Sequence, residues 1–122
     1  MRNTDKQSTV VAESAARTAT TSFSLIANTL GGAFIINVTA ASATPSVVFT
    51  VKGQDPASSA TWDILASAAI TGTGTTVLRV HPELTAAANT IAKDFLPKAV
   101  IVTATHADAD SITYSVGFAG VN

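Results

Sequence analysis

Two histidines are the first candidates for chemistry in this chain. His81 precedes Pro82, and His106 opens the run His106-Ala107-Asp108-Ala109-Asp110. Carboxylates that alternate beside an imidazole can present oxygen and nitrogen ligands to a cation. The run lacks the ligand number and the glycine of a calcium loop, and Asp in a connection between strands usually serves the turn itself. We therefore interpret Asp108 and Asp110 as turn residues, and we predict no metal site.

Residues suited to nucleophilic or acid–base catalysis are scattered along the chain. No serine lies in a Gly-x-Ser-x-Gly nucleophile elbow. Gly72-Thr73-Gly74 is followed by strand-forming residues, not by a helix, so it predicts a hairpin turn and not a phosphate-binding loop. Four other carboxylates each lie next to a predicted turn: Asp55, Asp63, Glu83 and Asp94. We predict no catalytic residue, no cofactor and no enzymatic activity.

Short β-strands must position these residues. Apolar and polar residues alternate in seven stretches rich in β-branched and aromatic side chains, which is typical of strands with one buried face. The stretches are 20–26, 33–40, 46–52, 61–67, 75–80, 99–105 and 111–118. We expect an all-β domain of about seven to eight short strands, either an antiparallel β-sandwich or a jelly-roll-like barrel. Trp62 shares one side of its stretch with Ile64 and Ala66, so we expect its ring in the core.

Three other segments have features of their own. Residues 1–16 are rich in Ala and Ser without a strand period, and we interpret them as an extended arm that orders against a partner, or as a loose tail. The β-sandwich domain then covers residues 17–122. Residues 82–89 predict either a short helical turn or a long crossover loop. Residues 38–53 and 102–117 are alike, each reading as strand, turn, strand, and we interpret them as two similar hairpins or as a chance likeness.

Composition narrows the classes of partner. Charged residues make up 12% of the 122 residues, the net charge is −1, and there is no cysteine. No cluster of Lys and Arg is present, so we predict no direct binding of nucleic acid. The first eight residues lack the apolar run of a signal peptide, and no stretch approaches a membrane span, so we expect synthesis in the cytoplasm and no membrane contact. A surface with few charges favours association with other proteins, because few charges must be desolvated.

Three segments resemble a group of small structural proteins of tailed bacteriophages. They are Ala43-Thr44-Pro45-Ser46-Val47-Val48-Phe49-Thr50-Val51, the run from Thr61 to Pro82, and the run from Ala104 to Gly117. The resemblance covers the chain from about Ala33 to its end and implies a head-decoration, or capsid cement, protein. It implies the major capsid protein as partner, a homotrimer, and a location on the outer surface of the virion.

Two other functions remain open at this point. One is a tail protein or another minor structural protein of the virion. The other is a carbohydrate-binding module, which the expected inward placement of Trp62 and Tyr114 disfavours because such modules expose aromatic rings. The expected arm, residues 1–16, is the candidate segment for contact with the capsid or with a neighbouring subunit.

Overall fold

The computed structural model describes residues 6–122 and contains nine β-strands in that range. The strands are β1 (Lys6–Arg17), β2 (Thr21–Ile26), β3 (Gly31–Ala41), β4 (Val47–Gln54), β5 (Thr61–Ala66), β6 (Gly74–Val80), β7 (Ile91–Ala92), β8 (Ala99–His106) and β9 (Ile112–Val121). The predicted all-β class is confirmed, and each of the seven predicted strands is present. Within residues 6–122 the chain forms no helix of the length and apolarity that crossing a membrane requires.

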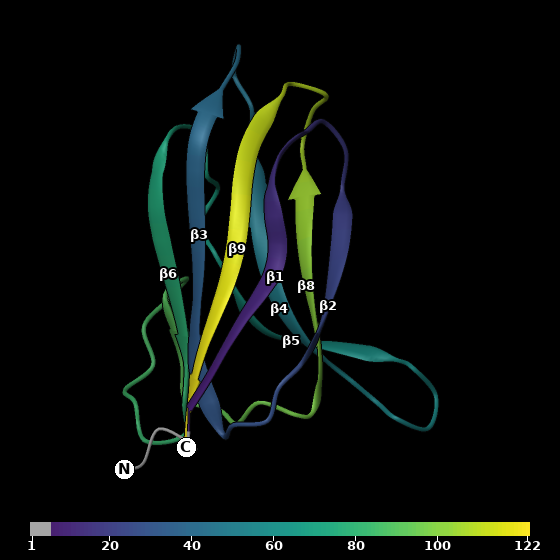
Figure 1. Ribbon diagram of the computed structural model, residues 1–122, viewed down its shortest axis with the longest axis vertical. Helices are drawn as coiled ribbons and strands as arrows, with labels where there is room; N and C mark the ends of the chain where they lie inside the picture. Colours follow the sequence, from purple (N-terminus) through teal and green to yellow (C-terminus); the bar gives the residue numbers. More distant parts are fainter. Residues whose placement is uncertain (1–5) are drawn as a thin grey trace.

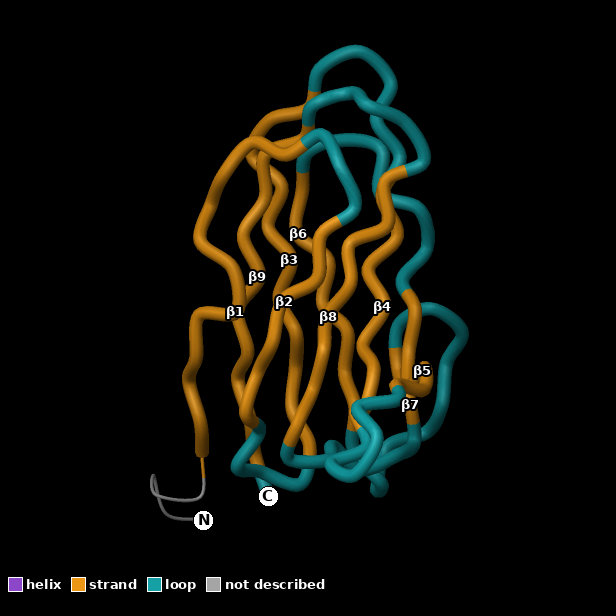
Figure 2. The backbone as a smooth tube through the Cα atoms, turned by 90° about the vertical axis from the view of Figure 1, so that its right-hand side faces the viewer, coloured by secondary structure: helices purple, strands orange, loops and turns teal. Residues whose placement is uncertain are grey.

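The strands form two sheets that pack face to face (Figures 1 and 2). Sheet A has the strand order β1-β9-β3-β6-β7, and sheet B has the order β2-β8-β4-β5. Every pairing between strands is antiparallel except that of β6 with the two-residue strand β7. The β-sandwich is therefore confirmed, with one short parallel strand added at the edge of sheet A.

The strand order is that of a jelly roll. Early strands pair with late strands in reverse order: β1 with β9, β2 with β8, β3 with β6 and β4 with β5. Two further pairings, β9 with β3 and β8 with β4, close the four-stranded core of each sheet. Eight strands paired in this nested way make two Greek keys, which defines the jelly roll. β7 is an addition to that plan.

The two predicted hairpins are wrong. β3 and β4 lie in different sheets, and so do β8 and β9, so residues 38–53 and 102–117 form two arches between the sheets. The arches lie against each other, with the Ser42 amide donating to the Ser111 carbonyl at 2.9 Å and the Ala107 amide donating to the Ser46 carbonyl at 2.9 Å. Gly72-Thr73-Gly74 likewise belongs to a crossing from β5 to β6, not to a hairpin. The alternation of apolar and polar residues indicates that a strand has one buried face. It does not indicate to which of the two sheets the strand belongs.

The described part of the expected arm is a strand of sheet A. Lys6–Arg17 forms β1 and pairs with β9 within the chain, while residues 1–5 of the expected arm lie outside the described residues. Register shifts fall between Val10 and Ala12 and again between Ala12 and Ala15. Bulges of this kind add unpaired residues and break the two-residue period. This is why the sequence shows no strand pattern here, and why Ala12 is the one residue of β1 that is buried.

One apolar core lies between the sheets. Phe34 packs against Phe118 with ring centroids 4.9 Å apart, and Phe49 meets Tyr114 edge to face at 4.9 Å. Residues 82–89 form neither a helical turn nor a crossover between the sheets, because they join β6 to β7 within sheet A. The loop begins with a turn in which the Leu84 amide donates to the His81 carbonyl at 3.2 Å. The crossing to sheet B comes after β7, where residues 93–98 lead into β8.

Candidate functional site

Exposed apolar side chains gather at one end of the sandwich. Strands β2, β4, β6 and β9 finish at this end, and β3, β5 and β8 begin there; it is at the bottom of Figure 1. We call it the apolar end. Among residues 6–122, five large apolar side chains are exposed, and four of them belong to this end: Ile26, Leu30, Trp62 and Phe95. The fifth, Val10, lies within β1.

Three of these side chains come from two segments that are hydrogen-bonded to each other. Ile26 and Leu30 flank the connection from β2 to β3, and Phe95 lies in the connection from β7 to β8. The Leu96 amide donates to the Leu30 carbonyl at 2.9 Å, and the Ala27 amide donates to the carbonyl of Lys98 at 2.8 Å. The apolar side chains next to these two hydrogen bonds stay exposed to solvent, Ile26 by 54% and Phe95 by 52%.

A shallow apolar pocket adjoins Ile26. Its volume is about 340 Å³, and its lining residues are Ile26, Gln54, Pro56, Pro97, Lys98 and Ala99. Ile26 faces outward because it follows the buried Leu25 in a strand, and successive side chains of a strand point to opposite faces. Strand alternation and the connecting loops together therefore leave an apolar surface at this end.

The expectation that Trp62 lies in the core is wrong. Its side chain is 42% exposed, and its ring lies over Gly53, its partner in the β4–β5 pairing. The register shifts by one residue between the pairs Val51–Leu65 and Lys52–Asp63, which leaves Ile64 unpaired. This bulge breaks the alternation that grouped Trp62 with Ile64 and Ala66. The structure buries Leu65 in their place.

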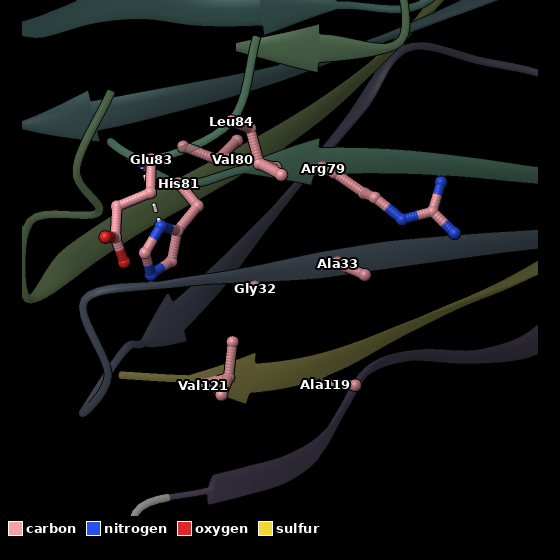
Figure 3. Close-up of a pocket in the computed structure, with 9 residues that line it drawn as sticks. All are labelled: Gly32, Ala33, Arg79, Val80, His81, Glu83, Leu84, Ala119 and Val121. Atoms are coloured by element: carbon pink, nitrogen blue, oxygen red, sulfur yellow. Dashed lines mark hydrogen bonds between the residues drawn. The ribbon is translucent and has the colours of Figure 1, made fainter. Parts of the chain in front are cut away.

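A groove of about 400 Å³ lies on the outer face of sheet A beside the apolar end (Figure 3). Small residues of β3 and β9 line its middle, where Ala33 is in register with Ala119. Leu84 and Val121, both half-buried, add apolar walls. Figure 3 shows the Arg79 side chain at one end of the groove, directed away from His81 and Glu83 at the other end.

His81 is held in a fixed place at its end of the groove. Its Nδ1 accepts a hydrogen bond from the Glu83 amide at 3.1 Å. The imidazole also lies close to Gly31, since a Cβ atom at that position would come within 2.7 Å of His81 Cδ2. Only a glycine permits this approach. The imidazole is therefore positioned by local backbone, and no second titratable side chain hydrogen-bonds it among the described residues.

The run predicted as turn residues lies at the opposite end of the sandwich. Asp110 Oδ2 accepts hydrogen bonds from the Thr44 amide at 3.1 Å and from the Thr44 hydroxyl at 3.3 Å. Asp108 Oδ1 accepts from the Asp110 amide at 3.0 Å. These contacts tie the two arches together and occupy the carboxylates as turn residues. Across residues 6–122, no three His, Asp or Glu side chains converge as metal ligands would.

His106 is packed next to a cluster of rings. Its ring centroid lies 6.3 Å from that of Tyr114, and neither of its nitrogens hydrogen-bonds another described residue. Burial lowers the pKa of His106, an effect that Asp108 opposes and Arg17 reinforces. Burial also raises the pKa of Tyr114, and the charge of Arg17 opposes that shift. Both shifts favour the neutral forms of these two side chains.

The apolar end was not among the sequence predictions, although one signal for it exists. Ile26 alternates with Leu25 and so had to face outward, and Leu30 stands directly before Gly31 and Gly32 in a turn. Neither fact alone shows that the two side chains lie at the same end of the sandwich as an exposed Phe95 from a distant segment. Comparison of the chain with protein-family models, with curated proteins and with solved structures found no match.

Proposed function

We propose that this protein is a head-decoration protein of a tailed phage, which binds the outer surface of the assembled capsid. The observation that supports the proposal best is the gathering of Ile26, Leu30, Trp62 and Phe95 at one end of the sandwich. Contiguous exposed apolar side chains on a soluble protein mark surfaces that bind other proteins. A phage shell offers many identical copies of such a partner.

The mechanism of stabilisation is mechanical. One molecule bound where capsid subunits meet adds an interface that must break before the shell ruptures under internal pressure. A contact that buries about 800 Å² per partner is enough for a stable complex. Three copies in a homotrimer would bind several subunits at once and gain avidity. The low content of charged residues, 12%, helps because few charges lose their water on binding.

The fold is one that viral capsid proteins use. Double-sheet jelly rolls occur in viral capsid proteins and also in lectins and other unrelated families. Fold alone does not assign a function, so the proposal is argued from the exposed side chains of the apolar end. The resemblance of residues 33–122 to small virion proteins gives the proposal its direction toward a capsid partner.

A tail or other minor virion protein is the first alternative, since the same apolar end would serve there. A carbohydrate-binding module is the second, and the exposed ring of Trp62 now favours it more than the sequence did. Tyr114 gives it no support, because that ring is fully buried. Location in the particle separates all three functions.

The test has two parts. Cryo-electron microscopy of the parent virion should show density for this chain on the outer head, with the apolar end toward the capsid. Decoration-free heads should bind the purified protein, and a Phe95→Ser or Ile26→Ser variant should bind about tenfold or more weakly, because buried apolar anchors dominate such interfaces. Val10→Ser, which removes an equally exposed apolar side chain outside the apolar end, serves as the control and should bind normally. Absence of the chain from the head overturns the proposal.

A further inference from the structure

The groove of Figure 3 lies in a part of sheet A whose outer face is almost uncharged. Cross-strand register places two rows of outward-facing residues side by side on β1, β9, β3 and β6. The first row is Val10, Gly117, Ile35 and Val77, and the second is Ser8, Ala119, Ala33 and Arg79. Outer faces of antiparallel sheets are usually polar. Here one ionisable side chain, Arg79, stands among seven small, apolar or hydroxyl-bearing neighbours.

Arg79 carries a charge that no other residue between Lys6 and Asn122 pairs with. The side chain is exposed, and it forms no ion pair or hydrogen bond with any other residue of the described range. Lys6 lies opposite Val121 in the β1–β9 pairing, which adds a second positive charge beside the groove wall. A guanidinium covered by a partner without an acceptor would be destabilising, because desolvating an unpaired charge is costly. A partner that covers this groove must therefore bring an anion to Arg79.

The two ends of the groove differ in charge. Glu83 is exposed at the end opposite Arg79, so it repels a carboxylate there and directs it toward Arg79. Between them, Ala33 and Ala119 leave room for a side chain, and Leu84 and Val121 offer apolar contact. The groove is therefore negatively charged at one end, apolar in the middle and positively charged at the other end.

We propose that this groove binds an extended segment of the capsid partner in which a bulky apolar side chain is adjacent to a carboxylate. The apolar side chain occupies the middle of the groove, over Ala33 and Ala119. The carboxylate pairs with Arg79, whose planar guanidinium binds carboxylates through two parallel hydrogen bonds. This inference rests on the proposed function for the identity of the partner, but not for the chemistry of the ligand.

A peptide titration tests the ligand chemistry without a capsid. The ¹⁵N-labelled full chain is titrated to millimolar concentration with two N-acetylated, C-amidated tetrapeptides, Ala-Leu-Glu-Ala and Ala-Leu-Gln-Ala. We expect the first to shift the amide signals of Ala33, Ala119 and Val121 and to bind several-fold more tightly than the second. Arg79→Gln should remove that difference. Equal binding of the two peptides, or no shift at the groove, overturns the inference.

Binding to decoration-free heads tests the partner. Arg79→Gln should weaken binding about tenfold, since removing one member of a buried charge pair has effects of this size or larger. Lys52→Gln is the control, because it removes a cation of β4 in sheet B that lines neither the groove nor the pocket at the apolar end. Glu83→Gln should leave binding unchanged or tighten it. Equal losses for Arg79→Gln and Lys52→Gln would show an effect of net charge alone and would overturn the inference.

The two experiments separate the two proposals. If wild-type protein binds heads and Arg79→Gln binds them equally well, the groove inference fails while the proposed function stands. If the wild type does not bind heads but the glutamate peptide binds at the groove, the proposed function fails and the ligand chemistry stands.

Discussion

The guanidinium of Arg17 lies 4.5 Å from the centre of the Tyr114 ring, at the edge of the sandwich where β1 ends. It also lies 5.0 Å from the centre of the Phe23 ring. Its N–H groups donate to the carbonyls of Glu13, Ala15 and Tyr114 at 2.8, 3.2 and 2.9 Å. Arg17 therefore covers the upper core and satisfies carbonyl groups next to the bulged part of β1 at the same time.

Replacing Arg17 with methionine keeps much of the side chain's length and removes both kinds of contact. We expect the free energy of unfolding to fall by about 1–3 kcal/mol, from lost cation–π contact and lost charge-assisted hydrogen bonds. Arg17→Lys should recover only part of this, because one ammonium cannot reach three carbonyls in a fixed plane. Urea denaturation measures the change. Lys6→Met, an exposed cation of the same strand, is the control and should change stability little.

His106 predicts how stability depends on pH. Burial lowers its pKa below the ordinary value of 6.5, so the unfolded chain binds a proton before the folded chain does as the pH falls. Stability should therefore be complete above about pH 6.5 and should decrease as the pH falls from there toward the lower folded pKa. His106→Gln should remove this part of the pH dependence, as seen in melting temperatures measured across pH 4–8. Asp108→Asn, which removes the opposing carboxylate, should steepen it.

The position of the Trp62 ring depends on Gly53, and the fluorescence of this ring can measure a change at that position. A Cβ atom at Gly53 would come within 2.6 Å of Cε2 of the indole, so Gly53→Ala should displace the ring. Because Trp62 is the only tryptophan, the fluorescence emission should shift to longer wavelength as the ring becomes more exposed. Gly117→Ala is the matched control, since a Cβ there meets nothing within 4 Å. That change should leave the emission unchanged and leave stability equal or higher by up to about 1 kcal/mol.

Tyr114 carries a hydroxyl that the core does not use. The side chain is fully buried, and its oxygen has no hydrogen-bond partner within the described chain. Tyr114→Phe keeps the ring contacts with Phe49 and Phe23 and removes the buried polar atom. We expect stability to be unchanged or higher by about 1 kcal/mol, because an unpaired buried hydroxyl is destabilising. A loss of more than that in thermal unfolding would show that the hydroxyl has a partner in solution.

The strands of the core could be predicted from the sequence because their alternation is regular. β9 buries every second residue, β3 does so from Phe34 to Val38, and β4 departs from this pattern only at Thr50; all three strands were found from their alternation. β1 was not found, because its bulges interrupt the period. β7 was not found because two residues are too few to show a period.

Connectivity and exposure were harder to predict. The segments around Pro45 and Asp108 look like hairpin turns, but both cross between sheets, and local sequence contains no information on that choice. Trp62 was misplaced by one bulge in β5. The apolar end depends on whether loops cover Ile26 and Phe95, which only the packing of distant segments decides. The groove at Arg79 likewise requires three strands in register.

The pairing of β1 with β9 has a consequence for how the protein is made. During synthesis β1 leaves the ribosome before the other eight described strands, and β9, the strand with which it pairs, leaves after them. Sheet A therefore cannot close until β9 has been translated. Folds dominated by contacts between distant segments fold slowly. A rare-codon pause placed before β9 should lengthen the life of a nascent state in which β1 is open to pulse proteolysis.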